Sequence, residues 1–395
     1  MENRFIFHVD VNSAFLSWSA SDRIKNGDTL DLRNVPSVVG GDEKSRHGIV
    51  LAKSVPAKKY GIVTGESLYS ARKKCPEVII IPPCFRVYKS CSSLLVSLLK
   101  EYTPAVEQYS IDECFMDVTY DMFDEPYKMA CSIKDRIKSE LGFTVSIGVS
   151  HNKLLAKMAS DLKKPDAVST IYPSEIQKKM WPLPVEELFM VGKRAKEKLN
   201  GMYIFTIGEL AQYDMKVLKS KFKSYGELIW KYANGIDESP VRSSDSELKA
   251  ISSSNTFSKD ITLREEAVRE IFLLCENVSA RLRKIHKYCG SLSVAIKSSD
   301  FRYYSHQKKF GYPTQSTKKV MLLAEELFDE MWKKEPIRLL GVSVSQLHDE
   351  SIRQISVFDD NSEEKENALD RAIDLIRCNY GDDSIKRACL MKKKK

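Results

Sequence analysis

Two acidic residues stand side by side in a stretch that otherwise suits a β-strand, EQYSIDECFMDVT. They are Asp112 and Glu113, and a third acid, Asp10, closes the apolar run FIFHVDV. Neighbouring side chains on a strand point to opposite faces, so one of the pair would enter the core at a high cost unless it is paired or bound to a metal. If Ser110–Glu113 forms a hairpin turn, both carboxylates can reach one side. The alternative is a pair of ordinary turn residues.

Three carboxylates that converge at one sheet edge repel each other unless cations lie between them. Two divalent ions about 3.5–4 Å apart would relieve the repulsion and would assist an in-line displacement at phosphorus. Mg²⁺ suits such a site, because it binds a few carboxylates together with substrate phosphates. The acids therefore predict phosphoryl-transfer chemistry.

A lysine-bearing segment, SIGVSHNKLLAKMASDLKKPD, predicts a strand followed by a helix that ends before Pro165. On a helical wheel Lys153, Lys157 and Lys164 share one face. Such a row of ammonium groups beside an acidic metal site is what a nucleoside triphosphate would need. The alternative is a solvated lysine face, which is the more common reason for this pattern.

The elements around these residues alternate between strands and helices. Up to Pro165 the order of strand, helix, hairpin, helix and strand predicts an α+β sheet domain. The next segment is helical with Pro and Gly interruptions, and residues 234–249 are polar and predict a linker. Residues from about 250 to 349 predict a second domain of the order β-α-β-β-α-β. A short helix is expected in the tail, near Ala368–Arg377.

The composition is typical of a soluble globular protein, since 43% of the 395 residues are hydrophobic and 29% are charged. The apolar runs are too short to span a bilayer, and the N-terminus has no secretory signal pattern. The nine cysteines lack CxxC spacing. This favours a reduced, cytoplasmic setting over disulfides or a zinc site.

Positive charge is concentrated in one part of the chain. The formal net charge is +8, and Lys392–Lys395 supply four of those charges. Between Arg281 and Lys319, ten basic residues stand against one acid, Asp300, with six aromatic residues interleaved. Basic and aromatic residues in this mixture favour a nucleic-acid surface. The alternative is a solvated basic face.

The segments HVDVNSAFLSW, YSIDECFMD and SIGVSHNKLLAKMASDLKKPD, in this order and at these separations, resemble the Y-family DNA polymerases. The resemblance is to the bacterial, polymerase IV-like members in particular, and it covers residues 4–350. It implies a template-directed, low-fidelity translesion DNA polymerase that serves DNA damage tolerance and repair. The implied fold class is α+β, a right hand with a ferredoxin-like palm, small fingers, a helical thumb and a separate β-α-β-β-α-β little finger.

The resemblance also implies domain boundaries. They are residues 1–21 and 82–165 for the palm, 22–81 for the fingers, 166–233 for the thumb, 234–249 for the linker, 250–349 for the little finger and 350–395 for the tail. Within the tail, QISVF resembles a sliding-clamp-binding peptide, which would anchor apolar side chains in a groove of the clamp. Its residues would be Gln354, Ile355, Val357 and Phe358, and the alternative is a final edge strand.

Site residues follow from the resemblance position by position. Asp10, Asp112 and Glu113 would be the catalytic acids and would hold two Mg²⁺ ions, with the Val11 carbonyl as a further ligand and Mn²⁺ as a substitute. Phe15 falls at the steric gate, where a bulky ring under the sugar would reject a ribose 2′-hydroxyl. Read without the resemblance, Phe15 is a core aromatic. The nucleotide-binding residues would be Lys58, Lys164, Lys157 and Ser110.

Primer-template DNA and dNTPs would be the substrates of a monomeric enzyme that associates with the nucleoid when it is on DNA. The implied DNA contacts are Gly192 and Lys193 in a helix-hairpin-helix of the thumb, and Lys297, Arg302, Lys308 and Lys309 in the little finger.

Four positions depart from the family pattern, and one of them is Ala14, which replaces a frequent aromatic beside the gate. Val55 and Lys58 stand where the family often has Tyr and Arg, which usually contact the triphosphate. Val55 offers no hydrogen-bond donor, and Lys58 keeps the positive charge but cannot form the bidentate hydrogen bonds of Arg. Met190 stands where the thumb motif usually has its first Gly, which leaves only Gly192. These departures predict weaker nucleotide binding or compensating groups elsewhere, and an altered phosphate-gripping loop.

Two other functions fit parts of the sequence. Gly40–Lys44, GGDEK, resembles the GGDEF signature of nucleotide cyclases, but it ends in Lys and does not follow the second carboxylate strand. Cyclic dinucleotide formation from GTP would favour this function. The other alternative is a non-catalytic DNA-binding or clamp-associated protein on a polymerase scaffold, which would not need the three acids. DNA binding without nucleotide incorporation would favour it.

Overall fold

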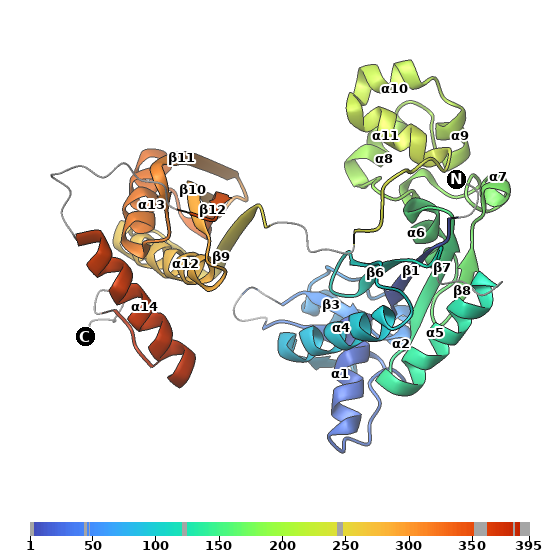
Figure 1. Ribbon diagram of the computed structural model, residues 1–395, viewed down its shortest axis with the longest axis horizontal. Coiled ribbons are helices and arrows are strands. Elements are labelled where there is room, and N and C mark those ends of the chain that lie inside the picture. Colours follow the sequence, from blue (N-terminus) through green and yellow to red (C-terminus); the bar gives the residue numbers. More distant parts are fainter. Residues whose placement is uncertain are drawn as a thin grey trace. The chain divides into compact units, whose positions relative to one another are not determined.

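The computed structural model describes residues 4–42, 46, 48–120, 125–242, 248–350, 362–381 and 384–387 (Figure 1). The clamp-like peptide 354–358, part of the GGDEK segment and the terminal lysines lie outside the described residues. The chain divides into two compact units, the first made of most of residues 1–246 and the second beginning at residue 247. Both units combine helices with a β-sheet, which confirms the predicted α+β fold class.

A five-stranded sheet forms the centre of the first unit, in the order β5-β6-β1-β7-β8. β1 pairs antiparallel with both β6 and β7, and all of its residues are buried. The strands are β1 (Ile6–Val11), β5 (Val106–Gln108), β6 (Glu113–Asp117), β7 (Val145–Ser150) and β8 (Val168–Thr170). The helices before residue 165 are α1 (Ala14–Lys25), α2 (Val55–Lys59), α3 (Leu68–Lys74), α4 (Phe85–Lys100), α5 (Pro126–Leu141) and α6 (Lys153–Leu162).

The two faces of this sheet meet different helices. Phe7 and Val9 of β1 pack with residues of α4 and α5 in one apolar core. His8 points the other way, and its Nδ1 lies 2.8 Å from the Ser160 hydroxyl on α6. Side chains two positions apart on a strand share a face, so Asp10 lies on the α6 side with His8.

Helix α6 lies in direct contact with β7, because Gly148 has no side chain. A Cβ atom at this position would lie 1.9 Å from the Ala156 carbonyl oxygen and 2.5 Å from the Ser160 nitrogen. Both atoms belong to the backbone of α6, which cannot yield as a flexible side chain can. The glycine therefore sets how closely the helix approaches the sheet.

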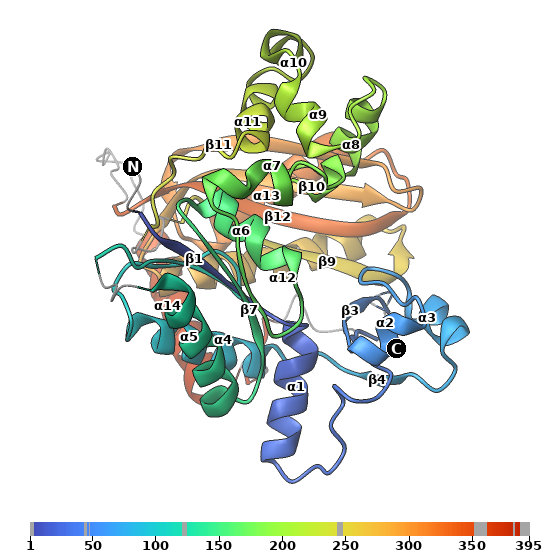
Figure 2. The ribbon, with the colours of Figure 1, turned by 90° about the vertical axis from the view of Figure 1, so that its right-hand side faces the viewer.

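A three-stranded sheet of the order β3-β2-β4 forms a separate layer of the first unit, with α2 and α3 beside it (Figure 2). Its strands are β2 (Ser37–Gly40), β3 (Val50–Lys53) and β4 (Ile79–Ile81). A helical segment follows the five-stranded sheet and shares an apolar core with Leu154, Leu155 and Met158 of α6. Its helices are α7 (Ile176–Lys179), α8 (Lys193–Asn200), α9 (Ile207–Gln212), α10 (Met215–Phe222) and α11 (Ser224–Ala233).

The expected linker begins as an ordered part of the first unit. The Asp237 carboxylate accepts a hydrogen bond from the backbone N–H of Leu154 at 3.1 Å. The backbone N–H of Arg242 donates to the Glu107 carboxylate at 2.8 Å, and Lys153 pairs with the same carboxylate at 2.8 Å. The chain up to residue 242 is therefore held against β5 and the start of α6.

The second unit is an antiparallel sheet of the order β11-β10-β12-β9 with α12 and α13 packed on one face. Along β10, Leu292, Val294 and Ile296 enter this core, whereas Ser293 and Ala295 lie half-buried on the opposite face. The elements are β9 (Ala250–Ile261), α12 (Arg264–Lys284), β10 (Tyr288–Ser298), β11 (Tyr303–Thr314), α13 (Thr317–Met331) and β12 (Ile337–His348). This is the predicted β-α-β-β-α-β order.

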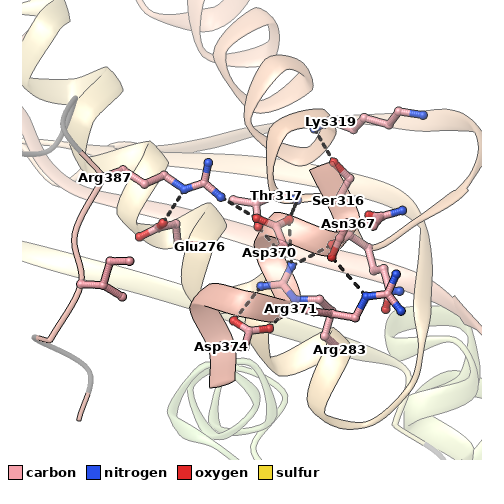
Figure 3. A network of polar contacts seen from close by, with 12 residues as sticks. Glu276, Arg283, Ser316, Thr317, Lys319, Asn367, Asp370, Arg371, Asp374 and Arg387 are labelled. Atoms are coloured by element: carbon pink, nitrogen blue, oxygen red, sulfur yellow. Dashed lines mark hydrogen bonds and ion pairs between the residues drawn. The ribbon is translucent and has the colours of Figure 1, made fainter. Parts of the chain in front are cut away.

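Helix α14 (Ser362–Tyr380) is longer than the predicted tail helix and is held on the second unit by a polar network (Figure 3). Asp370, which is only 3% exposed, accepts from the backbone N–H of Thr317 at 2.9 Å. The same carboxylate pairs with Arg283 at 3.2 Å and with Arg387 at 2.5 Å. The sequence predicts the helix but not this docking. No helix in the described chain is long and apolar enough to cross a membrane.

Candidate active site

Asp10 and Glu113 lie opposite each other on neighbouring strands. The antiparallel register of β1 and β6 pairs their Cα atoms, and both side chains lie on the face that α6 covers. Asp10 is only 8% exposed. Two carboxylates on such a face must be compensated by positive charge or by protons.

Asp112 reaches the same sheet edge through a turn. The backbone N–H groups of Tyr109 and Ser110 donate to the Glu113 carbonyl at 2.9 and 3.2 Å and close the turn between β5 and β6. The N–H of Val11 donates to the Asp112 carbonyl at 3.1 Å, which ties this turn to the end of β1. The Ser110 hydroxyl donates to the Asp112 carboxylate at 2.6 Å and so orients it.

Two lysines supply the positive charge. Lys157 on α6 places its Nζ atom 2.6 Å from Glu113 and 3.2 Å from Asp10. Lys164, which follows the helix, places its Nζ atom 3.0 Å from Asp10. Asp161 pairs with both lysines, at 3.5 and 2.8 Å. Two of the three lysines on the predicted face therefore meet the acids, whereas the third, Lys153, binds Glu107.

Burial and ion pairing act in opposite directions on these groups. Burial raises the pKa of Asp10, but the charges of Lys164 and Lys157 outweigh it and hold the pKa below its usual value. Burial keeps the pKa of Glu113 above its usual value, although Lys157 opposes the shift. Burial lowers the pKa of Lys157, but Asp10 and Glu113 reverse this, so the net pKa is raised. Lys157 is therefore charged at neutral pH.

The donor set fits a hard divalent cation, because three carboxylates and a backbone carbonyl offer only oxygen atoms. In the part of the chain that the structure describes, no three acidic, His or Cys side chains converge closely enough to enclose an ion. The ammonium of Lys157 lies between Asp10 and Glu113 and pairs with both carboxylates. A metal ion would take over the neutralisation that Lys157 provides.

A cavity of about 280 Å³ lies beside the acids and is lined by Asp10, Val11, Asp112 and Phe15, among others. Ser13 has a left-handed φ of 47° at the start of α1, so the chain turns sharply after β1 and brings Phe15 next to the acids. The Phe15 ring stacks on Tyr88 with centroids 4.5 Å apart and an interplanar angle of 8°. Phe15 is thus anchored by the core and borders the cavity.

Helix α2 carries the two departures from the nucleotide-binding pattern. The Ser54 hydroxyl caps the helix by accepting from the Ala57 N–H at 3.1 Å. Val55 follows it and is 50% exposed, an apolar side chain at the surface. Lys58 is exposed as well, and it forms no ion pair with any described residue. At the two positions that depart from the pattern, this helix therefore offers an anion one ammonium group, that of Lys58.

The loop before α8 keeps a glycine-like backbone without the glycine. Met190 has a φ of 75°, in the left-handed region that favours Gly. Its carbonyl accepts a hydrogen bond from the Tyr225 hydroxyl at 2.9 Å. Gly192 is the N-cap of α8, and the exposed Lys193 is the first residue of the helix. Met190 therefore adopts a backbone conformation that Gly would adopt without strain.

The basic residues predicted in the second unit lie on both faces of its sheet. Lys309 pairs in register with Ser291, which places it on the same face as Lys297, opposite the helices. Lys308 lies on the helical side, where it pairs with Glu326 at 2.8 Å and with Glu330. Arg302 pairs with Asp300 at 2.5 Å and with Glu335 at 2.9 Å.

Sequence reasoning missed two residues of these clusters. Asp161 escaped notice, although its spacing of four and three residues from Lys157 and Lys164 is a visible signal for ion pairs on a helix. Arg338 lies 4.7 Å from the centroid of the Phe301 ring, as does the ammonium of Lys297. Only the pairing of β12 with β10 brings Arg338 to this place, so no sequence pattern could have indicated it.

Known proteins resemble this chain in fold and in sequence. A Y-family DNA polymerase chimera shares the fold with a TM-score of 0.77 at 23% sequence identity, over 87% of this chain and 99% of that chain. The impB/mucB/samB family matches residues 9–161, and the C-terminal domain of that family matches residues 248–357. A DNA polymerase IV of Clostridium acetobutylicum is 57% identical over 392 residues, 99% of either chain.

The chain belongs to the Y family of DNA polymerases, with the polymerase IV proteins. Further relatives named DNA polymerase IV are 37% identical in Acetivibrio thermocellus, over 98% of either chain, and 36% identical in Bacillus subtilis, over 98% of this chain and 95% of that protein. This Y-family member is a translesion DNA-directed DNA polymerase. Neither the cyclase nor the non-catalytic alternative is supported.

Proposed function

We propose that Asp10, Asp112 and Glu113, with the Val11 carbonyl, hold two Mg²⁺ ions in the active site of this polymerase, and that Mn²⁺ substitutes for them. The observation that carries the proposal is the convergence of Asp10 and Glu113 on one ammonium group, beside a cavity that Phe15 also lines. The bound ions would activate the primer 3′-hydroxyl and neutralise charge on the triphosphate.

The reaction joins a dNTP to the primer. The primer 3′-oxygen loses its proton and attacks the α-phosphorus, and pyrophosphate leaves. Lys164 and Lys58 bind triphosphate oxygens and offset the charge that develops on the leaving pyrophosphate. Ser110 keeps the Asp112 carboxylate in position. Phe15 lies under the sugar, where its ring excludes a ribose 2′-hydroxyl.

The division into palm, fingers and thumb is part of the proposal. Four strands of the five-stranded sheet, within residues 1–21 and 82–165, would belong to the palm, and the three-stranded sheet within residues 22–81 to the fingers. The fifth strand, β8, pairs with β7 and so extends the palm sheet past the expected boundary at residue 165. The helical segment 166–233 would be the thumb, which holds the duplex through Gly192 and Lys193. Small fingers, whose described residues form three short strands and two short helices, would cover little of the nascent base pair and admit damaged templates.

The second unit, residues 250–349, would be the little finger that binds primer-template DNA. Its sheet face opposite the helices supports this role, because small half-buried residues such as Ser293 and Ala295 lie there with Lys297 and Lys309. Small side chains let a phosphate backbone approach, and lysines neutralise it. Residues 354–358 would bind a sliding clamp, and the enzyme would act as a monomer.

Primer extension with Mg²⁺ tests the metal site. The wild-type chain should extend a primer, and the double variant Asp112→Ala, Glu113→Ala should lose on the order of 100- to 1000-fold in rate. Asp117→Asn is the matched control, because Asp117 lies on the same strand and binds Arg4 at 3.2 Å instead of lining the cavity. Equal extension by the wild type and the double variant would refute the assignment.

Extension across a lesion, with and without clamp, tests the remaining parts. Deletion of residues 354–358 should abolish stimulation by the clamp and leave extension by the polymerase alone unchanged. Stimulation that survives the deletion would remove the clamp-binding role from this peptide.

A further inference from the structure

The cavity beside the acids contains one cation that no family resemblance assigned. Its lining joins Asp10, Asp112 and Phe15 from the five-stranded sheet and α1 to Lys53 and Thr64 around the three-stranded sheet. A nucleotide whose phosphates reach the acids and whose sugar covers Phe15 must lie against Lys53. This step rests on the proposed nucleotide site.

Strand β3 turns Lys53 toward the cavity. Along Val50–Lys53, residues alternate between buried and half-buried, so Leu51 and Lys53 share the outer side of the strand while Val50 enters the core beneath α3. The β2 register pairs Lys53 with Val38, which fixes the position of its backbone. Lys53 is therefore held by a strand, not by a loop.

The ammonium of Lys53 has hydrogen-bonding capacity to spare. It donates to the Ile62 carbonyl at 2.6 Å, which uses one of its three N–H groups. No carboxylate of the described residues pairs with it, and Glu66, the acid that raises its pKa, is already bound by Lys74 at 2.7 Å. Burial and the charge of Lys58 lower the pKa of Lys53 below its usual value. A polyanion would offset the repulsion between Lys53 and Lys58 and would accept hydrogen bonds from the unused N–H groups of Lys53.

We propose that Lys53 binds the incoming nucleotide in this enzyme, in place of a donor that is absent at Val55. Lys53 is a half-buried cation on the wall of the nucleotide cavity, whereas Val55 presents only methyl groups to solvent. The acceptor is either a triphosphate oxygen or an acceptor atom on the edge of the incoming base. Both chemistries need the charged N–H donor that Lys53 supplies.

Single-nucleotide incorporation by the full-length chain tests the proposal, with all four dNTPs opposite their complements. Lys53→Gln removes the charge and keeps a donor for the Ile62 carbonyl. Its KM for dNTP should rise on the order of tenfold, the effect of a charge-assisted hydrogen bond, with a smaller change in kcat. Lys53→Arg should restore KM. Lys59→Gln is the matched control, because Lys59 is an exposed lysine on the adjacent helix α2, outside the cavity.

The pattern across the four nucleotides identifies the acceptor. An equal rise in KM for every dNTP indicates a phosphate contact, whereas a rise confined to purines, and absent for 7-deaza-purine nucleotides, indicates the base edge. A KM of Lys53→Gln that matches that of Lys59→Gln overturns the proposal. So does a joint loss of kcat and thermal stability that Lys53→Arg fails to restore, because that result makes Lys53 a support for the Ile62 loop. Failure of the wild type to incorporate any dNTP would instead refute the proposed function.

Discussion

The ammonium of Lys157 lies 2.6 Å from the carboxylate of Glu113, and the two side chains are 12% and 19% exposed. The same ammonium lies 3.2 Å from Asp10. One lysine thus pairs with two of the acids that we propose as metal ligands, on a buried face. A metal ion that binds these carboxylates must therefore compete with Lys157 for them.

Lys157→Met should destabilise the fold and make its stability depend on metal. The loss leaves Glu113 without its ion pair and Asp10 with Lys164 alone, which should lower the free energy of unfolding by roughly 2–4 kcal/mol. Because Mg²⁺ can neutralise the same carboxylates, it should raise the melting temperature of the variant more than that of the wild type. Thermal denaturation with and without MgCl₂ measures this. Lys163→Met, an exposed lysine beside the helix end, is the control, and equal Mg²⁺ effects in both variants would contradict the prediction.

Phe15→Ala should relax the selection against ribonucleotides. The variant removes the ring that borders the cavity, so the ratio of kcat/KM for dNTP over rNTP should fall on the order of 10- to 100-fold. Single-nucleotide incorporation with matched dNTP and rNTP measures the ratio. Phe85→Ala is the control, because the Phe85 ring lies 6.0 Å from Phe15 and is not part of the cavity lining. An unchanged ratio would remove Phe15 from the gate role.

Lys309 and Lys308 should differ in their effect on DNA binding, although they are neighbours. Lys309→Ala removes a lysine that we propose contacts a phosphate, and it should reduce the slope of log K against log salt by about 1. Lys308→Ala should leave the slope unchanged, because Lys308 is bound by Glu326 and Glu330 on the helical side. Titration of primer-template DNA at several salt concentrations distinguishes the two. The same loss of slope in both variants would show that the helical side also contacts DNA.

Met190→Gly should be tolerated, and Met190→Val should not. Gly adopts the φ of 75° without steric cost. Gly removes the backbone strain of Met190 in the folded chain but makes the unfolded chain more flexible. These effects oppose each other, so the free energy of unfolding should change by less than about 1 kcal/mol. Val is β-branched and should lose about 1–2 kcal/mol in this conformation. Chemical denaturation measures both variants, and equal stability of Gly and Val at this position would contradict the argument from φ.

Asp370→Ala should release α14 from the second unit. The change removes the acceptor of the Thr317 N–H and leaves Arg283 and Arg387 without their shared carboxylate. Breaking a buried charge network of this kind costs roughly 3–5 kcal/mol at most, which exceeds what holds a single peripheral helix. Amide hydrogen exchange should therefore become fast throughout α14. Arg371→Ala, at an exposed position on the same helix, should leave the exchange slow.

The strand period accounts for what the sequence could predict at the active site. It places Asp10 and His8 on one face, and the turn at Ser110–Asp112 then explains how two adjacent acids reach the same edge. The same period places Lys308 and Lys309 on opposite faces of β11. The docking of α14 and the position of Lys53 could not be predicted, because they depend on partners such as Arg283 and Ile62 that only the folded chain brings near. The fold class and the order of elements in the second unit could be predicted without knowing such contacts, because local sequence patterns determine them.

Gly148 has a consequence for how the charge balance of the active site can be altered. A methyl group there would push α6 away from β7, and with it the ammonium groups of Lys157 and Lys164. Coulombic attraction between partly buried charges weakens with each ångström added to contacts that now measure 2.6 and 3.0 Å. The distance between β7 and α6 therefore sets the strength of the ion pairs that Lys157 and Lys164 form with the acids. A substitution at Gly148, which has no functional group of its own, can therefore weaken these ion pairs.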